Sequence, residues 1–223
     1  ITLSDGQGQL VIRLSYDGCC ILDQAIVRGR EVASDSGVFT GIHTDGQWFT
    51  TKNIATPSVT LGRDTLTVTG IKFGRPGAEI HETWHFTVES NQIVWRITRK
   101  YPAEATLEDA AFPKWDFSSM STWDGGMLDN GGVIWNKYLD KTNTTYGAHF
   151  GTVTFWNSQS NDCLRITPDL PGNQSGAGRI SHQTNGVFSF NYAISQEHHN
   201  PKPDLRRFLG NYREPVWPFP IQP

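Results

Sequence analysis

Short runs of alternating apolar and polar residues recur along most of this 223-residue chain. In residues 79–88, for example, Ile80, Trp84, Phe86 and Val88 alternate with polar positions. A period of two places successive side chains on opposite faces of a β-strand, whereas a helix needs apolar residues three and four positions apart. Turn residues separate the runs at intervals of about 8–12 residues, which is typical of all-β proteins. The pattern therefore predicts an all-β chain with almost no helix.

These runs are too numerous for one immunoglobulin-like sandwich. We therefore expect a large sandwich of two antiparallel sheets over residues 1–200. Outside the region of residues 79–101, the strand candidates are residues 10–16, 19–27, 58–73, 148–157, 162–169, 178–184 and 187–194.

The last residues, 201–223, differ in composition from the rest. Asp204 could cap a short helix over residues 205–209, and Gly210 could end it. The stretch NYREPVWPFPIQP that follows is rich in proline, which favours an extended linker. Because the chain also begins at Ile1 without a methionine, we expect a piece of a longer protein, followed by a further domain.

Residues 81–85 read HETWH and match the H-E-x-x-H pattern of zinc proteases. Zinc requires both histidine nitrogens within about 2.1 Å of one ion. Positions four apart meet that condition on a helix, but on a strand they lie about 13 Å apart. The alternation around His81 and His85 predicts a strand, so we expect neither a zinc site nor a protease.

The same segment is expected to form a hairpin, with residues 79–88 antiparallel to 92–101. Glu82 then falls on the apolar face, where a carboxylate needs a charged or hydrogen-bonding partner. Arg99 extends the apolar face of the partner strand and could supply it. The pair could be a structural salt bridge, or it could hold a loop that faces a ligand.

Composition argues against several classes of function. The formal charge of −3 gives no support for nucleic-acid binding, which needs a basic face. No apolar run approaches the ~20 residues of a membrane span. The sequence has no phosphate loop, nucleophile elbow or EF-hand motif, so we expect no cofactor. Cys19, Cys20 and Cys163 are too few for a disulfide framework and are expected to be small buried apolar residues, although Cys163 could pair with one of the other two.

One glycine-rich segment, residues 114–138, interleaves tryptophan with aspartate and reads as a loop. Sugars stack their C–H faces on aromatic rings and hydrogen-bond to carboxylates, so this segment is a candidate glycan site. A second exposed tryptophan is expected in the polar stretch HTDGQWFTT. The tryptophans could instead fill the core, and the aspartates could form turns. The candidate ligand-binding residues are Trp48, Trp115, Asp116, Trp123, Asp124 and Trp135.

Three stretches and the hairpin pattern E-x-W-x-F-x-V…I-x-W-x-I-x-R-x-Y (residues 82–101) resemble a known domain. The stretches are GQGQLVIRL (6–14), FPKWDF (112–117) and GGVIW (131–135). The domain is the β-super-sandwich, related to the galactose mutarotase-like fold, that precedes (α/α)-barrel catalytic domains in many glycoside hydrolases. The resemblance implies a secreted or periplasmic, non-catalytic domain that supports a downstream catalytic domain and contributes loops to a cleft for an oligo- or polysaccharide.

Two other functions stay open. The chain could be an autonomous glycan-binding module, or a small sugar epimerase or lyase. The asparagine–histidine segment typical of aldose epimerases has no match here, since the nearest stretch, GAHFGT (147–152), lacks the asparagines. A glycosidase would need two carboxylates at a defined separation, which the sequence leaves open.

Overall fold

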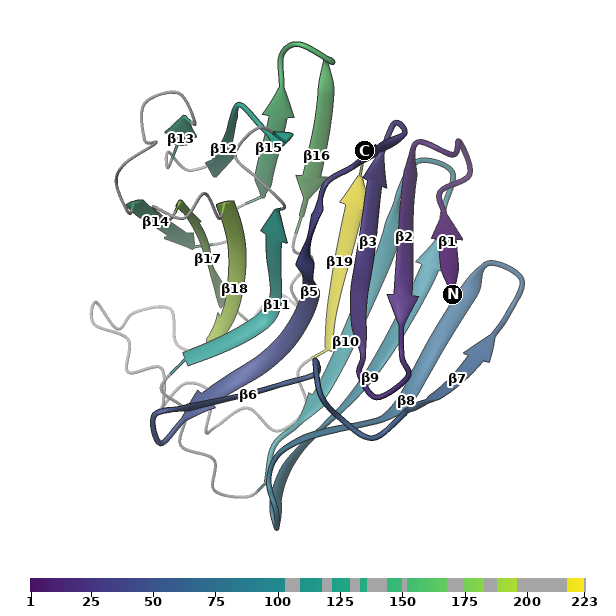
Figure 1. Ribbon diagram of the computed structural model, residues 1–223, viewed down its shortest axis with the longest axis vertical. Coiled ribbons are helices and arrows are strands. Elements are labelled where there is room, and N and C mark those ends of the chain that lie inside the picture. Colours follow the sequence, from purple (N-terminus) through teal and green to yellow (C-terminus); the bar gives the residue numbers. More distant parts are fainter. Residues whose placement is uncertain are drawn as a thin grey trace.

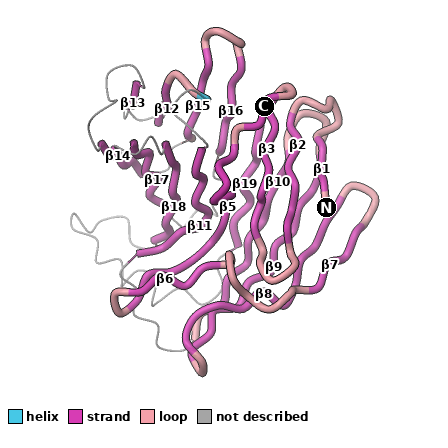
Figure 2. Tube along the Cα trace, in the orientation of Figure 1, coloured by secondary structure: helices cyan, strands magenta, loops and turns pink. Residues whose placement is uncertain are grey.

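The computed structural model describes residues 1–102, 109–117, 122–128, 133–135, 144–149, 152–167, 175–182, 188–195 and 216–222. Within these ranges the regular elements are β-strands, arranged in two antiparallel sheets that pack face to face (Figure 1). Strands and their connecting loops account for almost all of the described trace (Figure 2). The predicted all-β, two-sheet sandwich is therefore confirmed. None of the described residues forms an apolar helix long enough to cross a membrane.

The first sheet has ten strands within the described ranges, in the order β1-β2-β3-β5-β11-β18-β17-β14, with β4 beside β3 and β6 beside β5. The bounds are β1 (Thr2–Ser4), β2 (Leu10–Ser15), β3 (Ile21–Val27), β4 (Arg30–Glu31), β5 (Ala33–Thr44), β6 (Gln47–Thr50), β11 (Asp109–Phe117), β14 (Thr144–His149), β17 (Ser175–His182) and β18 (Phe188–Ser195).

The second sheet has nine strands within the same ranges, in the order β13-β12-β15-β16-β19-β10-β9-β8-β7. The bounds are β7 (Ser58–Leu61), β8 (Thr65–Arg75), β9 (Ala78–Val88), β10 (Ile93–Lys100), β12 (Gly125–Leu128), β13 (Val133–Trp135), β15 (Val153–Asn157), β16 (Asp162–Ile166) and β19 (Val216–Gln222).

The core lies between the two sheets and is rich in aromatic side chains. Trp84 and Phe86 of β9 and Trp95 of β10 are fully buried. The ring centroids of Trp84 and Trp95 are 4.7 Å apart, and those of Phe86 and Trp95 are 5.2 Å apart. Burying a large apolar side chain contributes about 1.5–3 kcal/mol, so this cluster stabilises the sandwich strongly.

The β9–β10 hairpin is confirmed, with Trp84 opposite Ile97 and Glu82 opposite Arg99. His81 and His85 therefore lie four residues apart on one strand, about 13 Å from each other, and cannot share an ion. The ring of His85 is instead hydrogen-bonded through Nδ1 to the hydroxyl of Thr67 on β8, at 2.8 Å.

The expectation of an extended linker at the C-terminal end is wrong for residues 216–222. They form β19, which lies between β10 and β16 inside the second sheet (yellow in Figure 1). Proline lacks an N–H, and Pro218 and Pro220 alternate with Trp217 and Phe219, so the missing donors all fall on one side of the strand. β16 pairs with β19 only at Ile221 and Gln222, beyond these prolines. The helix expected at 205–209 lies outside the described residues.

The segment expected as a long loop, residues 114–138, also differs from the prediction. Its described residues belong to β11, β12 and β13, except residues 122–124, which precede β12. All three cysteines are free; Cys20 is fully buried, as expected, and Cys19 and Cys163 are half-buried. Burial raises the pKa of the Cys20 thiol well above its ordinary value.

Candidate functional site

The outward face of β5 and β11 in the first sheet carries a group of charged and aromatic residues. Thr40 of β5 points into the sandwich, because its hydroxyl donates to Oε2 of Glu82 on the opposite sheet at 2.6 Å. Since side chains alternate along a strand, Phe39 and His43 point away from the core. On β11, Trp115 belongs to the core, so its neighbours on either side also point outward.

Those neighbours are Lys114 and Asp116, and the register places Lys114 directly beside Phe39. The Lys114 ammonium lies 3.6 Å from Oδ1 of Asp116. A third charged residue, Lys52, follows β6 and places its ammonium 3.9 Å from the centre of the Phe39 ring. Phe39 faces outward but is only 6% exposed, because the Lys52 side chain lies over its ring.

Asp116 is the most unusual member of this group. It is 8% exposed, yet its Oδ1 accepts no hydrogen bond from any described residue. A buried carboxylate oxygen left without a hydrogen bond costs about 1–3 kcal/mol, and more when the group is charged. A ligand hydroxyl that donates to this oxygen would recover part of that cost.

Trp48 of β6 stands on the same outward face, farther along β5. It pairs across the sheet with His43, and the two ring centroids are 5.3 Å apart with planes inclined at 42°. Trp48 is 43% exposed, so part of its indole is available for stacking. We refer to His43, Trp48, Lys52, Lys114 and Asp116 as the polar face.

The structure divides the predicted ligand-binding residues into two groups. Trp48 and Asp116 belong to the polar face, whereas Trp115 and Trp123 are each 1% exposed and pack in the core. The expectation that these two rings meet a sugar is corrected, because burial leaves neither ring face open. The alternative that tryptophans of this segment fill the core holds for both.

Asp124 has a structural role, although its contacts are long-range and not those of the local turn that was the alternative for it. Its carboxylate accepts hydrogen bonds from both the backbone N–H, at 2.7 Å, and the hydroxyl of Ser158. Trp135 lies in β13, and its side chain is outside what the structure describes.

Sequence reasoning missed Lys52, Lys114 and His43 as members of the group. Lys114 alternates with Trp115, so the strand period could have placed it outward once β11 was recognised as a strand. Nothing in the sequence indicates that Lys52 contacts Phe39. This contact depends on the path that the chain takes after β6, which places Lys52 next to β5.

The buried pair of Glu82 and Arg99 forms a second polar group, inside the sandwich. Arg99 Nε donates to Glu82 Oε1 at 2.5 Å, and both side chains are fully buried, so the predicted partner is confirmed. The remaining Glu82 oxygen accepts from Trp84 Nε1 at 2.8 Å, besides Thr40. Arg99 also donates to the hydroxyl of Tyr101 and to the carbonyl of Ala111. The pair thus links the two sheets and is closed to a ligand.

The charged residues of the polar face shift the pKa of Lys52. Partial burial lowers the pKa of its ammonium, Asp116 opposes this shift, and Lys114 adds to it. Replacing Asp116 with asparagine should therefore lower the pKa of Lys52 further, and Lys114→Gln should raise it. The pH dependence of Lys52 acylation, followed by mass spectrometry, measures both shifts. As a control, Lys72→Gln should leave the titration of Lys52 unchanged, and shifts of the same sign in both test variants would contradict the arrangement.

Comparison with known proteins bears on the fold. No family model matches the sequence, and no curated protein matches it significantly. Among solved structures, a protein assigned to the aldose 1-epimerases, from Escherichia coli K12, gives a TM-score of 0.58 at 11% identity, covering 99% of this chain and 97% of its own. The Slr1438 protein of Synechocystis sp. PCC 6803 gives 0.59 at 7% identity, covering 100% of this chain and 94% of its own.

A third similar structure is the galactose mutarotase related enzyme of Lactobacillus acidophilus. Its TM-score is 0.57 at 9% identity, and the match covers 100% of this chain and 96% of that one. At such low identities these likenesses establish a common fold and leave the activity open. The chain therefore has the galactose mutarotase-like β-sandwich fold.

Proposed function

We propose that this chain is a carbohydrate-binding β-super-sandwich domain that holds a saccharide on its polar face. The observation that carries the proposal is Asp116, a buried carboxylate on the same face as the half-exposed Trp48. Its Oδ1 forms an ion pair with Lys114 at 3.6 Å but accepts no hydrogen bond from any described residue. A sugar hydroxyl donates to Asp116 Oδ1, while the ammonium groups of Lys114 and Lys52 donate to neighbouring sugar oxygens. The indole of Trp48 stacks on the apolar C–H face of a ring.

We also propose that this domain belongs to a larger enzyme. In glycoside hydrolases, a sandwich of this kind supports a catalytic domain and contributes to the glycan cleft. We place this chain in such a secreted or periplasmic enzyme, with an oligo- or polysaccharide as its ligand. The resemblance of the β9–β10 hairpin pattern to that domain supports this assignment.

Binding can be measured by calorimetry on a panel of neutral and acidic saccharides. Trp48→Ala should weaken binding about tenfold, which corresponds to about 1.4 kcal/mol of lost stacking. Asp116→Asn should weaken it by about tenfold or more, because a hydrogen bond to a charged group contributes about 1.5–3 kcal/mol. Leu61→Ala is the control, since Leu61 is a 62% exposed apolar residue of β7 on the other sheet. If no saccharide of the panel binds, the proposal is wrong.

A small sugar epimerase is a second candidate, favoured by one feature of the polar face. Lys52 has a lowered pKa and lies close enough to Asp116 to be influenced by its charge, and such a pair can exchange a proton with a sugar. The interconversion of α and β anomers, followed by NMR, tests this activity. Turnover lost in both Lys52→Gln and Asp116→Asn would favour the epimerase over the binding domain.

A further inference from the structure

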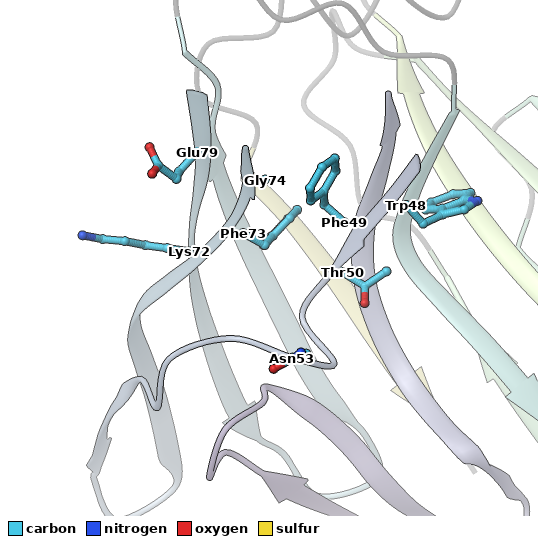
Figure 3. A pocket seen from close by; sticks show the side chains of 8 residues that line it. All are labelled: Trp48, Phe49, Thr50, Asn53, Lys72, Phe73, Gly74 and Glu79. Carbon is cyan, nitrogen blue, oxygen red and sulfur yellow. The ribbon is translucent and has the colours of Figure 1, made fainter. Parts of the chain in front are cut away.

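A pocket of about 340 Å³ opens between β6 and the β8–β9 hairpin, at one edge of the polar face (Figure 3). Phe49 of β6 and Phe73 of β8 approach each other in it, and Asn53 lies below them (Figure 3). Trp48 lies on one side of these rings, and Lys72 projects on the other. The volume falls within the range of about 300–1,000 Å³ that is usual for small-molecule sites.

The lining indicates which class of ligand the pocket suits. Two aromatic rings offer apolar walls, while the amide of Asn53 and the hydroxyl of Thr50 offer polar contacts. Lys72 and Glu79 carry opposite charges close to one another. Hydrogen bonds from backbone N–H groups and the nearby cations lower the pKa of Glu79, so its carboxylate is ionised at neutral pH. A ligand with apolar faces, many hydroxyls and no net charge fits these groups.

The pocket and the Asp116 end of the polar face are too far apart for one sugar ring. Lys114 lies beside Phe39 on β5, and Trp48 lies beside His43. Phe39 and His43 are four residues apart on this strand, which corresponds to about 13 Å. Trp48 both contacts the His43 ring and lines the pocket, so it joins the two ends.

Given the proposed saccharide function, on which this inference rests, we propose that the ligand is an uncharged oligosaccharide of at least two units. One unit contacts Asp116 and Lys114, the chain crosses Trp48, and a further unit occupies the pocket between Phe49 and Phe73. The pocket is thus a second subsite, and it makes affinity depend on chain length.

Calorimetry with the whole chain and a length series tests this directly. The ligands are linear gluco-, manno-, galacto- and xylo-oligosaccharides of one to four units, together with one uronic-acid trimer. For the sugar type that binds, affinity should rise at least tenfold between one and three units, and the uronic-acid trimer should bind more weakly. Asn53→Ala and Phe49→Ala should each weaken trimer binding about three- to tenfold and leave binding of the monomer unchanged.

Two further variants distinguish a failure of the oligosaccharide inference from a failure of the proposed function. Asp116→Asn should weaken monomer and trimer alike, and Arg63→Gln, in the exposed β7–β8 turn, should change neither. Circular dichroism verifies that each variant is folded, and Glu79→Gln replaces Phe49→Ala if the latter unfolds. A monomer that binds as tightly as the trimer would refute the oligosaccharide inference while leaving the proposed function intact. If no saccharide of any length binds, both are wrong.

Discussion

Deletion of residues 216–223 is expected to lower the free energy of unfolding by about 5 kcal/mol or more, which is comparable to the whole stability of a small domain. β19 forms six residue pairs with β10 and two with β16. Each backbone hydrogen bond contributes about 1 kcal/mol, and the deletion also leaves two unpaired strand edges inside the sheet. The truncated chain should therefore aggregate, or unfold at a much lower urea concentration than the full chain.

Urea denaturation followed by tryptophan fluorescence measures this effect, with size-exclusion chromatography to detect aggregates. A control removes residues 1–3, which include two of the three residues of β1, a strand at the edge of the first sheet that pairs with β2. That deletion should lower the free energy of unfolding much less, because it leaves no gap within a sheet. An unchanged unfolding midpoint after deletion of residues 216–223 would mean that the segment is a linker after all.

Arg99→Met is expected to lower the free energy of unfolding by about 3–5 kcal/mol. The substitution leaves the Glu82 carboxylate buried without its cation. It also removes donors to Tyr101 and Ala111 on the partner elements. The desolvation cost of Glu82 then remains, while most of the interactions that compensate it are lost. Equilibrium urea denaturation at neutral pH measures the change.

Two comparison variants show whether the unpaired charge of Glu82 causes the loss of stability in Arg99→Met. The double variant Glu82→Gln/Arg99→Met removes both charges and should recover a large part of the loss. Arg99→Lys keeps the charge and loses the planar fork of donors, so its stability should lie between wild type and Arg99→Met. A loss below about 1 kcal/mol for Arg99→Met would show that the pair contributes no more than an exposed salt bridge.

Much of the fold could be predicted because strand character is encoded locally. The alternation in residues 79–101 predicted the hairpin, and its apolar face correctly put Glu82 opposite Arg99. The alternating runs at residues 10–16, 19–27 and 58–73 likewise predicted strands where the structure has β2, β3, β7 and β8. β19 was missed because its prolines outweighed an alternation of Trp217, Phe219 and Ile221 that is also visible in the sequence. Proline is compatible with a strand where the missing N–H faces no partner, and that depends on the neighbouring strand.

The site was predicted only in part. Two of the six candidate residues, Trp48 and Asp116, lie on the polar face, while Trp115 and Trp123 are in the core. A tryptophan beside an aspartate has the same appearance in a sequence whether the ring is inside or outside. The strand that carries it and the sheet that packs against it decide which of the two it is.

The amino-acid sequence by itself determined that this chain forms strands, and which residues of the β9–β10 hairpin face the core. These are properties of the two-residue period, which acts over a few neighbouring positions. Only the tertiary structure decided that residues 216–222 are an interior strand, and that Lys52 meets Phe39 beside Asp116. Both depend on contacts between segments far apart in the sequence, and the packing of the two sheets brings such segments together.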